Sequence, residues 1–368
     1  MTFDPKLAPP TAAPIACHAD PEFLQWFSQA NYSLILSTYQ AGSVILLGWN
    51  GKQMSLLLRQ FDKPMGIAVS GDRLALATRH QVFQFANSPV LATDYLEQQR
   101  GRYDSLYLPR VSYFTGDLNI HDLAFAGEQL WIVNTRFSCL STLSAEYNFI
   151  PQWQPPFISE LVPEDRCHLN GLAVANGRPK YVTALGNSDR AGGWRSQKAT
   201  GGIIIDIDTG DLVYQGLSMP HSPHWYKGYL WVLNSGAGEL WRIDTNAQTH
   251  DVICALPGFS RGLAFVGDYA IVGVSQIRET NIFGDLPVQK RFPQLLCGLA
   301  VINLTTGKPT GQLTFSRGTE ELYDVQVLPQ TTRPTLLNLD KEATRQAFST
   351  PDFAYWLRPS SEKLQGLS

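Results

Sequence analysis

An internal repeat constrains the fold of this chain more than any other feature of its sequence. Six short segments recur at intervals of 40 to 62 residues: MGIAVSG (65–71), HDLAFAG (121–127), NGLAVAN (170–176), HSPHWYK (221–227), RGLAFVG (261–267) and YDVQVLP (323–329). Five of them are followed by a second apolar run, such as QLWIVNTR after the segment that begins at 121. A unit of about 50 residues holds four short strands, and a series of such units is typical of a β-propeller.

The composition favours the same all-β class. Charged residues make up 17% of the 368 residues, against about 25% in an average globular chain, whereas glycine (30) and proline (23) are abundant. These values exclude a disordered chain and a coiled coil. A pair of β-sandwiches is the alternative, but it would not require a recurring residue at the head of each segment. We therefore predict one six-bladed β-propeller over residues 20–340.

The two ends of the repeat predict how the ring closes. Residues 32–61 offer three strand-like runs without an inner strand, and residues 323–328 supply an inner strand followed only by TLLNL. Pairing the N- and C-terminal strands in one blade would remove two exposed sheet edges. Residues 1–19 are predicted to form a disordered tail, and Asp20 and Pro21 to begin a short helix. Residues 341–368 are predicted to form a C-terminal extension with a short helix.

Charge and cysteine content narrow the class of partner. The net charge of −3 provides no basic field for nucleic acid or for an anionic membrane. No run of 18 apolar residues predicts a membrane span. The five cysteines form an odd set without CxxC spacing, which fits neither a disulfide framework nor a structural zinc site. We therefore expect a cytoplasmic protein that binds neither nucleic acid nor membrane.

The repeat also predicts a site. The N-terminal ends of the inner strands meet at one mouth of the channel, and alternation along a strand places the residues two positions earlier on the same side. Neutral imidazoles with a carboxylate suit a divalent transition metal such as Fe, Zn, Mn or Cu. The alternative is that the histidines bond backbone carbonyls in a narrow channel. The predicted metal ligands are His121, His168, His221, Glu321, Asn170 and His224, of which His224 is equally suited to support His221 without ligation.

Arginines near this mouth predict an anionic substrate. A guanidinium beside a metal ion is unfavourable unless a substrate carboxylate bridges the two. Arg261, Tyr323 and Arg136 are the predicted catalytic residues. The glycine-rich loop 186–202 has the composition of a mobile lid with an aromatic contact. The predicted substrate-binding residues are Asp189, Trp194, Arg195, Arg278 and Glu279.

Six motifs resemble those of a known family. They are NTRFSCLSTL (134–143), EDRCHLNGLAV (164–174), GLSMPHSPHW (216–225), LPGFSRGLAFVG (256–267), SQIRE (275–279) and EELYDVQVLP (320–329). They resemble an uncharacterised bacterial family, common in cyanobacteria and proteobacteria, whose members are sometimes joined to or encoded near tetratricopeptide-repeat proteins. The resemblance covers about residues 22–340. It implies a propeller-like fold and a tetratricopeptide-repeat protein as a partner, but no activity.

A more distant resemblance is to the six-bladed gluconolactonase and senescence-marker group. Members of that group hold a divalent ion with acidic and amide side chains. Only Asn170 and Glu321 match these roles here, so the resemblance does not extend to lactone hydrolysis.

Two functions follow from the sequence. The first is a metal-dependent hydrolase or oxidoreductase that acts on a small or peptidyl anionic substrate at the channel mouth. The second is a non-catalytic propeller that binds a protein or peptide through a patch of aromatic and cationic side chains. That patch would comprise Trp194, Arg195, Arg136 and Arg278.

Overall fold

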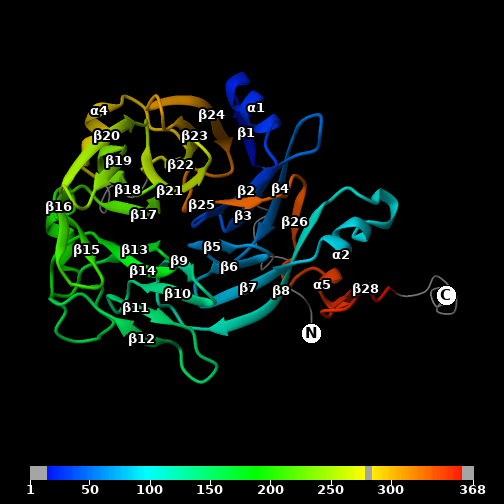
Figure 1. The fold of residues 1–368 in the computed structure, drawn as a ribbon, viewed down its shortest axis with the longest axis horizontal. Helices are drawn as coiled ribbons and strands as arrows, with labels where there is room; N and C mark the ends of the chain where they lie inside the picture. The colour runs from blue at the N-terminus through cyan, green and yellow to red at the C-terminus, as the bar shows by residue number, and fades with distance from the viewer. Residues whose placement is uncertain (1–14, 278–283, 359–368) are drawn as a thin grey trace, which may run out of the picture.

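The computed structural model describes residues 15–277 and 284–358 and shows a six-bladed β-propeller (Figure 1). All six repeat segments form the inner strands of the six blades. Each inner strand contacts the inner strands of both neighbouring blades, so the ring is closed. The predicted fold is therefore confirmed.

Each blade has four antiparallel strands, written here from the inner to the outer strand, and the second and sixth blades carry a fifth strand at the outer edge. The first contains β25 (Asp324–Pro329), β2 (Tyr32–Thr38), β3 (Ser43–Trp49) and β4 (Met54–Gln60). The second contains β5 (Ile67–Ser70), β6 (Arg73–Ala77), β7 (Gln81–Asn87), β8 (Ser105–Phe114) and β26 (Pro334–Leu336). The third contains β9 (Ile120–Ala126), β10 (Gln129–Asn134), β11 (Cys139–Thr142) and β12 (Ile150–Trp153).

The remaining three blades follow in chain order. The fourth contains β13 (Leu169–Ala175), β14 (Arg178–Ala184), β15 (Gly202–Asp206) and β16 (Leu212–Leu217). The fifth contains β17 (Pro220–Tyr226), β18 (Tyr229–Asn234), β19 (Glu239–Asp244) and β20 (Thr249–Ala255). The sixth contains β21 (Phe259–Val266), β22 (Tyr269–Ser275), β23 (Gly298–Asn303), β24 (Lys308–Arg317) and β1 (Ala16–Ala19).

Closure joins the two ends of the chain within one blade, as predicted. Strand β25 pairs antiparallel with β2, from Tyr32 opposite Pro329 to Ser37 opposite Asp324. The chain then crosses to the second blade, where β26 adds a parallel outer strand to β8. Figure 1 shows the blue and orange strands side by side at this closure.

The N-terminal segment corrects one boundary. Residues 16–19, expected in a disordered tail, form β1 and pair with β24, because the backbone groups at the edge of β24 accept a further strand. Helix α1 (Pro21–Ser28) follows, and the Asp20 side chain caps it by accepting the N–H of Phe23 at 2.7 Å. Phe23 and Phe27 of α1 are buried against the first and sixth blades.

Side-chain contacts between adjacent inner strands alternate around the ring. In three blades, the second residue of the repeat segment has a side chain that accepts a hydrogen bond. Asp122 accepts the N–H of Leu172 at 2.9 Å, Ser222 that of Gly262 at 3.0 Å, and Asp324 that of Ile67 at 2.7 Å. The other three blades carry glycine at that position, where the next blade lies too close for a Cβ: Gly66, Gly171 and Gly262. Acceptors and glycines thus give the ring a three-fold pattern.

Short helices and a hairpin complete the described chain. They are α2 (Pro89–Asp94), η2 (Glu97–Gln99), η3 (Gly193–Gln197), η4 (Ser235–Ala237), α4 (Pro287–Arg291), α5 (Ala343–Gln346), β27 (Ala347–Ser349) and β28 (Ala354–Trp356). Helix α5 lies within the segment in which a short C-terminal helix was predicted. All five cysteines lie in the described segments, and no disulfide joins any two of them. None of the helices in the described segments combines the length and apolar character needed to cross a bilayer.

Candidate functional site

A pocket of about 200 Å³ lies at one mouth of the channel. It is formed by the segments that lead into the inner strands, by the turn after β2, and by η3 with the end of β14. Its lining residues are Tyr39, Gln40, Asn119, His121, Asp165, His168, Leu185, Trp194, Arg195, Met219, His221, Arg261, Glu321 and Tyr323. This is the face on which the sequence predicted a site.

The tautomer of His121 follows from its hydrogen bonds. Its Nδ1 lies 3.0 Å from the carbonyl oxygen of Asn119 and 2.9 Å from the Thr135 hydroxyl. A carbonyl only accepts, and the Thr135 hydroxyl donates its own hydrogen to the carbonyl of Leu169 at 2.6 Å. The proton of neutral His121 is therefore on Nδ1, and its Nε2 is left as an acceptor.

His221 repeats this arrangement two blades further on. Its Nδ1 donates to the carbonyl of Met219 at 2.8 Å and approaches the hydroxyl of Ser235 at 3.1 Å. Both hydroxyl residues, Thr135 and Ser235, follow their histidine by 14 positions. The Nε2 of His221 accepts a hydrogen bond from Arg261 at 3.1 Å.

His168 is held by a carboxylate. Its Nδ1 lies 2.9 Å from both oxygens of Asp165, which also accepts the indole N–H of Trp194 at 3.1 Å. The Nε2 of His168 then faces the Nε2 of His121 at 3.2 Å. Two bare nitrogens at this distance repel each other, so the pair requires a shared hydrogen or a cation between them.

Burial keeps His121 and His221 neutral. It lowers the pKa of His121 well below its usual range, and neighbouring His168 and Arg261 lower it further. Burial also lowers the pKa of His221, with Arg261 as the next cause. Both imidazoles therefore keep Nε2 as an acceptor at neutral pH, and in His221 this nitrogen accepts the hydrogen bond of Arg261.

Arg261 lacks a carboxylate partner. No described Asp or Glu lies within ion-pair distance of it, and its guanidinium stacks 4.2 Å from the ring centre of Tyr323. The Nε of Arg261 and the hydroxyl of Tyr323 are buried without a hydrogen-bond partner. A half-buried cation that no described carboxylate contacts as an ion pair is suited to an anionic ligand.

Residues in the left-handed backbone conformation place these side chains at the pocket. The sequence had predicted instead that the alternation of side chains along an extended strand would do so. Asn119, His168 and Met219, each two positions before a repeat head, have φ of 53°, 53° and 48°. Asp165 also has a positive φ, of 50°. Such conformations are costly for residues other than glycine and often occur at functional sites. Here they turn two carbonyls toward histidine Nδ1 atoms.

The structure does not assemble the full predicted set of metal ligands. The Asn170 amide already has hydrogen-bond partners: it donates to the carbonyl of Pro220 in the fifth blade at 2.8 Å and accepts from Thr183 in its own blade at 2.6 Å. His224 lies toward the C-terminal end of β17 and lines a separate pocket at the opposite mouth of the channel. Within residues 15–277 and 284–358, no three His, Cys, Asp or Glu side chains are placed to hold one ion.

Two predicted polar residues also lie outside the lining of the mouth pocket. Arg136 forms an ion pair with Asp117 at 3.0 Å, and Asp189 forms one with Arg166 at 2.8 Å. Their charges are therefore used within surface loops. The predicted substrate-binding residues Arg278 and Glu279 lie outside the described residues.

Trp194 corrects the interaction patch proposed from sequence. Its side chain is only 3% exposed and packs with Leu185 and Met219, because the loop folds as η3 over the mouth. A buried indole is not displayed to a partner. Instead its ring lies 4.4 Å from that of His168, and its N–H holds Asp165.

Sequence reasoning missed several residues of the site. Asp165 stands three positions before His168, a spacing that brings the two together only through the left-handed turn. Tyr39 lies in the turn of another blade and stacks with Tyr323 at 5.8 Å. The shared spacing of Thr135 and Ser235 from their histidines was the one signal available in the sequence.

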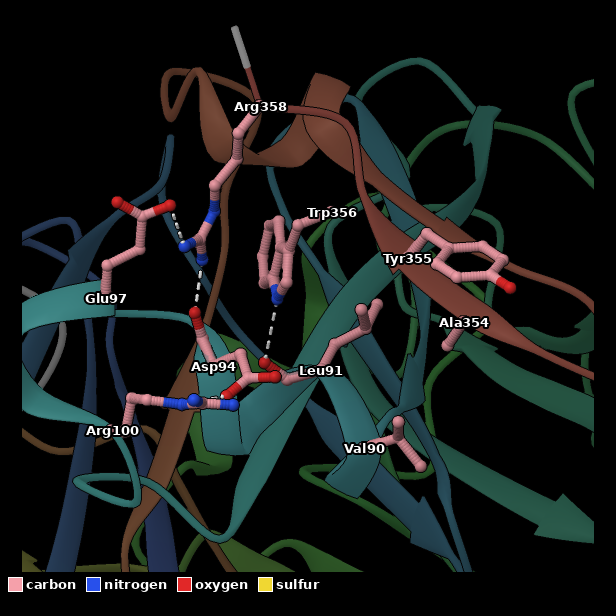
Figure 2. A pocket seen from close by; sticks show the side chains of 9 residues that line it. All are labelled: Val90, Leu91, Asp94, Glu97, Arg100, Ala354, Tyr355, Trp356 and Arg358. Carbon is pink, nitrogen blue, oxygen red and sulfur yellow. Dashed lines mark hydrogen bonds and ion pairs between the residues drawn. The ribbon is translucent and has the colours of Figure 1, made fainter. Parts of the chain in front are cut away.

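A second pocket, of about 480 Å³, lies away from the channel between α2 and the C-terminal hairpin (Figure 2). Its polar groups are already paired: Arg100 bonds Asp94 at 2.7 Å, and the indole of Trp356 donates to the carbonyl of Leu91 at 3.1 Å. Arg358 pairs with Glu97 and donates to backbone carbonyls of the α2 region. These contacts attach the hairpin to the second blade and leave the channel mouth as the better candidate site.

Comparisons with known proteins support the fold. A family model described as "Domain of unknown function (DUF4915)" matches residues 21–337, close to the range of the expected family resemblance. A protein of unknown function from Bacteroides caccae is similar in structure over 81% of this chain and 99% of that one, with a TM-score of 0.50 and 7% identity.

A chain from a nidogen/laminin complex matches over 81% of this chain and 99% of its own length, with a TM-score of 0.47 and 10% identity. No curated protein matches the sequence. At 7% identity, the likeness to the Bacteroides caccae protein shows the propeller fold and nothing of an activity.

Proposed function

The chain belongs to the DUF4915 family, and we propose that it is an enzyme that binds a small anionic substrate at the channel mouth and moves a proton through His168. The observation that carries the proposal is Arg261, a cation without a described carboxylate partner in a pocket that also holds the facing imidazoles of His121 and His168.

The proton-transfer role rests on the contacts of His168. Asp165 fixes its Nδ1–H, so Nε2 is the atom that gains or loses a proton at the pocket. His121 Nε2 lies 3.2 Å from His168 Nε2, so a proton that His168 takes up at this atom can be donated to His121. An oriented imidazole with a carboxylate behind it is suited to general acid–base catalysis.

Pocket size limits the substrate. At about 200 Å³, the mouth pocket is smaller than the roughly 300–1,000 Å³ of pockets that bind drug-sized ligands. η3 further covers the mouth with Trp194 and Arg195. A small molecule therefore suits the site better than the peptidyl substrate also considered from sequence.

Binding of simple anions tests the proposal. Propionate and phosphate would be titrated into the protein by isothermal calorimetry, with Arg261→Met compared with Arg136→Met, an arginine outside the pocket. We expect one of these anions to bind the unaltered protein and Arg136→Met equally, and Arg261→Met at least about tenfold more weakly. Equal binding to both variants, or none to the unaltered protein, would contradict the proposal.

A metal-dependent form of this activity is the second candidate, and one contact favours it. His121 and His168 each donate Nδ1–H to an oxygen, as metal-binding histidines commonly do. Two nitrogens about 2.0–2.1 Å from one zinc ion stand roughly 3.3 Å apart in tetrahedral geometry, close to the observed 3.2 Å. These two residues would hold the ion, which would supply Lewis acidity, whereas the guanidinium of Arg261 opposes it.

Elemental analysis separates the two candidates. Protein purified at neutral pH without chelator would contain a stoichiometric transition metal only in the second case. That metal would be lost in His121→Gln and His168→Gln and kept in His224→Gln, a histidine at the opposite mouth. A metal content well below one ion per chain would favour the first candidate, in which His168 transfers protons without a metal.

A further inference from the structure

We infer that the substrate class is an α-amino acid, whose carboxylate binds Arg261 and whose ammonium group donates hydrogen bonds to the Nε2 atoms of both His121 and His168. This inference rests on the proposed function and specifies the substrate of the same pocket. It follows from the distribution of donors and acceptors in the pocket.

One side of the pocket offers acceptors without hydrogens. Nδ1–H of His121 is donated to the Asn119 carbonyl, and Nδ1–H of His168 faces Asp165. The two Nε2 lone pairs therefore converge at 3.2 Å. An ammonium group carries three hydrogens and can satisfy both nitrogens, whereas a simple carboxylate supplies none. Glu321, which accepts the backbone N–H of Gln40 at 2.9 Å, lines the same pocket.

The other side offers donors. Arg261 donates to His221 through Nη2 and stacks on Tyr323, and no described carboxylate forms an ion pair with it. Tyr323 separates the two sides, with its ring centre 4.2 Å from the guanidinium carbon and 5.6 Å from the His121 ring. Opposite charges on one small ligand match two such adjacent sides. An α-amino acid carries both charges on a single carbon.

The competing ligand is an α-hydroxy acid, which has the same carboxylate and a hydroxyl group. Its single hydrogen can be donated to only one of the two Nε2 atoms. The two classes therefore differ at the histidine pair and not at Arg261.

Matched ligands distinguish them. One set is L-alanine, L-lactate and propionate, and a larger set is L-phenylalanine, 3-phenyllactate and 3-phenylpropionate. Binding at pH 7.5 would be followed by the imidazole resonances of the unaltered full-length protein. We expect the amino acid of at least one set to bind about tenfold or more tightly than its two analogues. His168→Gln should remove that preference, whereas His224→Gln should keep it.

The outcomes separate this inference from the proposed function. If a hydroxy acid or plain acid binds as tightly as its amino acid, the inference is wrong although the anion site stands. If phosphate binds and no carboxylate does, the inference is likewise wrong and the anion site stands. If no anion binds, or if Arg261→Met leaves all affinities unchanged, the proposed function itself fails. The ligand comparison on the unaltered protein decides the inference even if His168→Gln does not fold.

Discussion

At the scale of single residues, hydrogen-bond partners decide what each channel histidine can do. The repeat predicted that His121, His168, His221, Arg261 and Tyr323 share one mouth, and all five line the same pocket. It could not predict which ring nitrogen is free, because this depends on carbonyls turned inward by left-handed residues. It misplaced His224, since β17 passes through the ring and carries His224 to the other mouth.

A buried carboxylate makes stability depend on pH. Burial raises the pKa of Asp324 to about 7, so the folded protein holds a proton there that the unfolded chain releases near pH 4. The stability from this group is present at low pH and is lost as pH rises from about 4 to 7. Asp324→Asn cannot ionise and should lack this loss.

Urea unfolding at pH 5 and pH 8 measures the effect. Asp324→Asn should be less stable than the unaltered protein at pH 5, because an amide has one fewer acceptor for the N–H groups of Ile67 and Val325. At pH 8 the difference in free energy of unfolding between the two proteins should be smaller than at pH 5 by more than about 1 kcal/mol. Exposed Asp211→Asn serves as control, and a gap that does not change with pH would refute the prediction.

At the scale of elements, the strands were predictable and some of their packing was not. Apolar runs predicted the inner strands because each inner strand is buried among other blades. Strand β1 was missed because residues 16–19 carry no apolar alternation, and pairing with β24 defines it as a strand. The alternation of acceptor and glycine was visible in the repeat, but its role required seeing which backbone the next blade brings near.

Gly262 tests the contact between blades. An alanine Cβ there would lie 2.6 Å from the backbone nitrogen of Val325 in the next blade, and φ at this position is +79°. Gly127 has a similar φ of +62° in an open turn with nothing within 4 Å. Both alanine variants bear the cost of a left-handed residue, but only Gly262→Ala adds a clash with backbone.

The difference between the two variants isolates that clash. Gly262→Ala should be less stable than Gly127→Ala by about 2 kcal/mol or more in urea unfolding. Equal losses would show that the blades move apart freely at this position.

At the scale of the whole molecule, the ring closes through the pairing of β2 with β25, two strands that are distant in the sequence. The sequence predicted this closure because the repeat left one blade without an inner strand. It did not predict that TLLNL would cross to the second blade as β26, or that the C-terminal hairpin would pack on α2. Those contacts depend on edges and surfaces that show no periodicity in the sequence.

Two truncations distinguish the closing strand from the hairpin. A chain that ends at residue 321 lacks β25 and β26, so β2 loses its inner partner and the buried Leu34 and Leu36 lose the packing of Val325. Because each blade contacts its neighbours around the ring, the loss spreads to the whole sheet system.

A chain that ends at residue 340 keeps the closed ring and loses only α5 and the hairpin, which cover a small cluster around Leu91 and Leu106. We expect the 1–340 chain to keep β-sheet circular dichroism and one cooperative thermal transition at a lower midpoint. The 1–321 chain should show neither, because an open ring exposes two sheet edges and the apolar faces of two blades. A cooperatively folded 1–321 chain would mean that the five remaining complete blades hold their arrangement without closure, and the strand pairing of β2 with β25 would then be a consequence of the ring and not its cause.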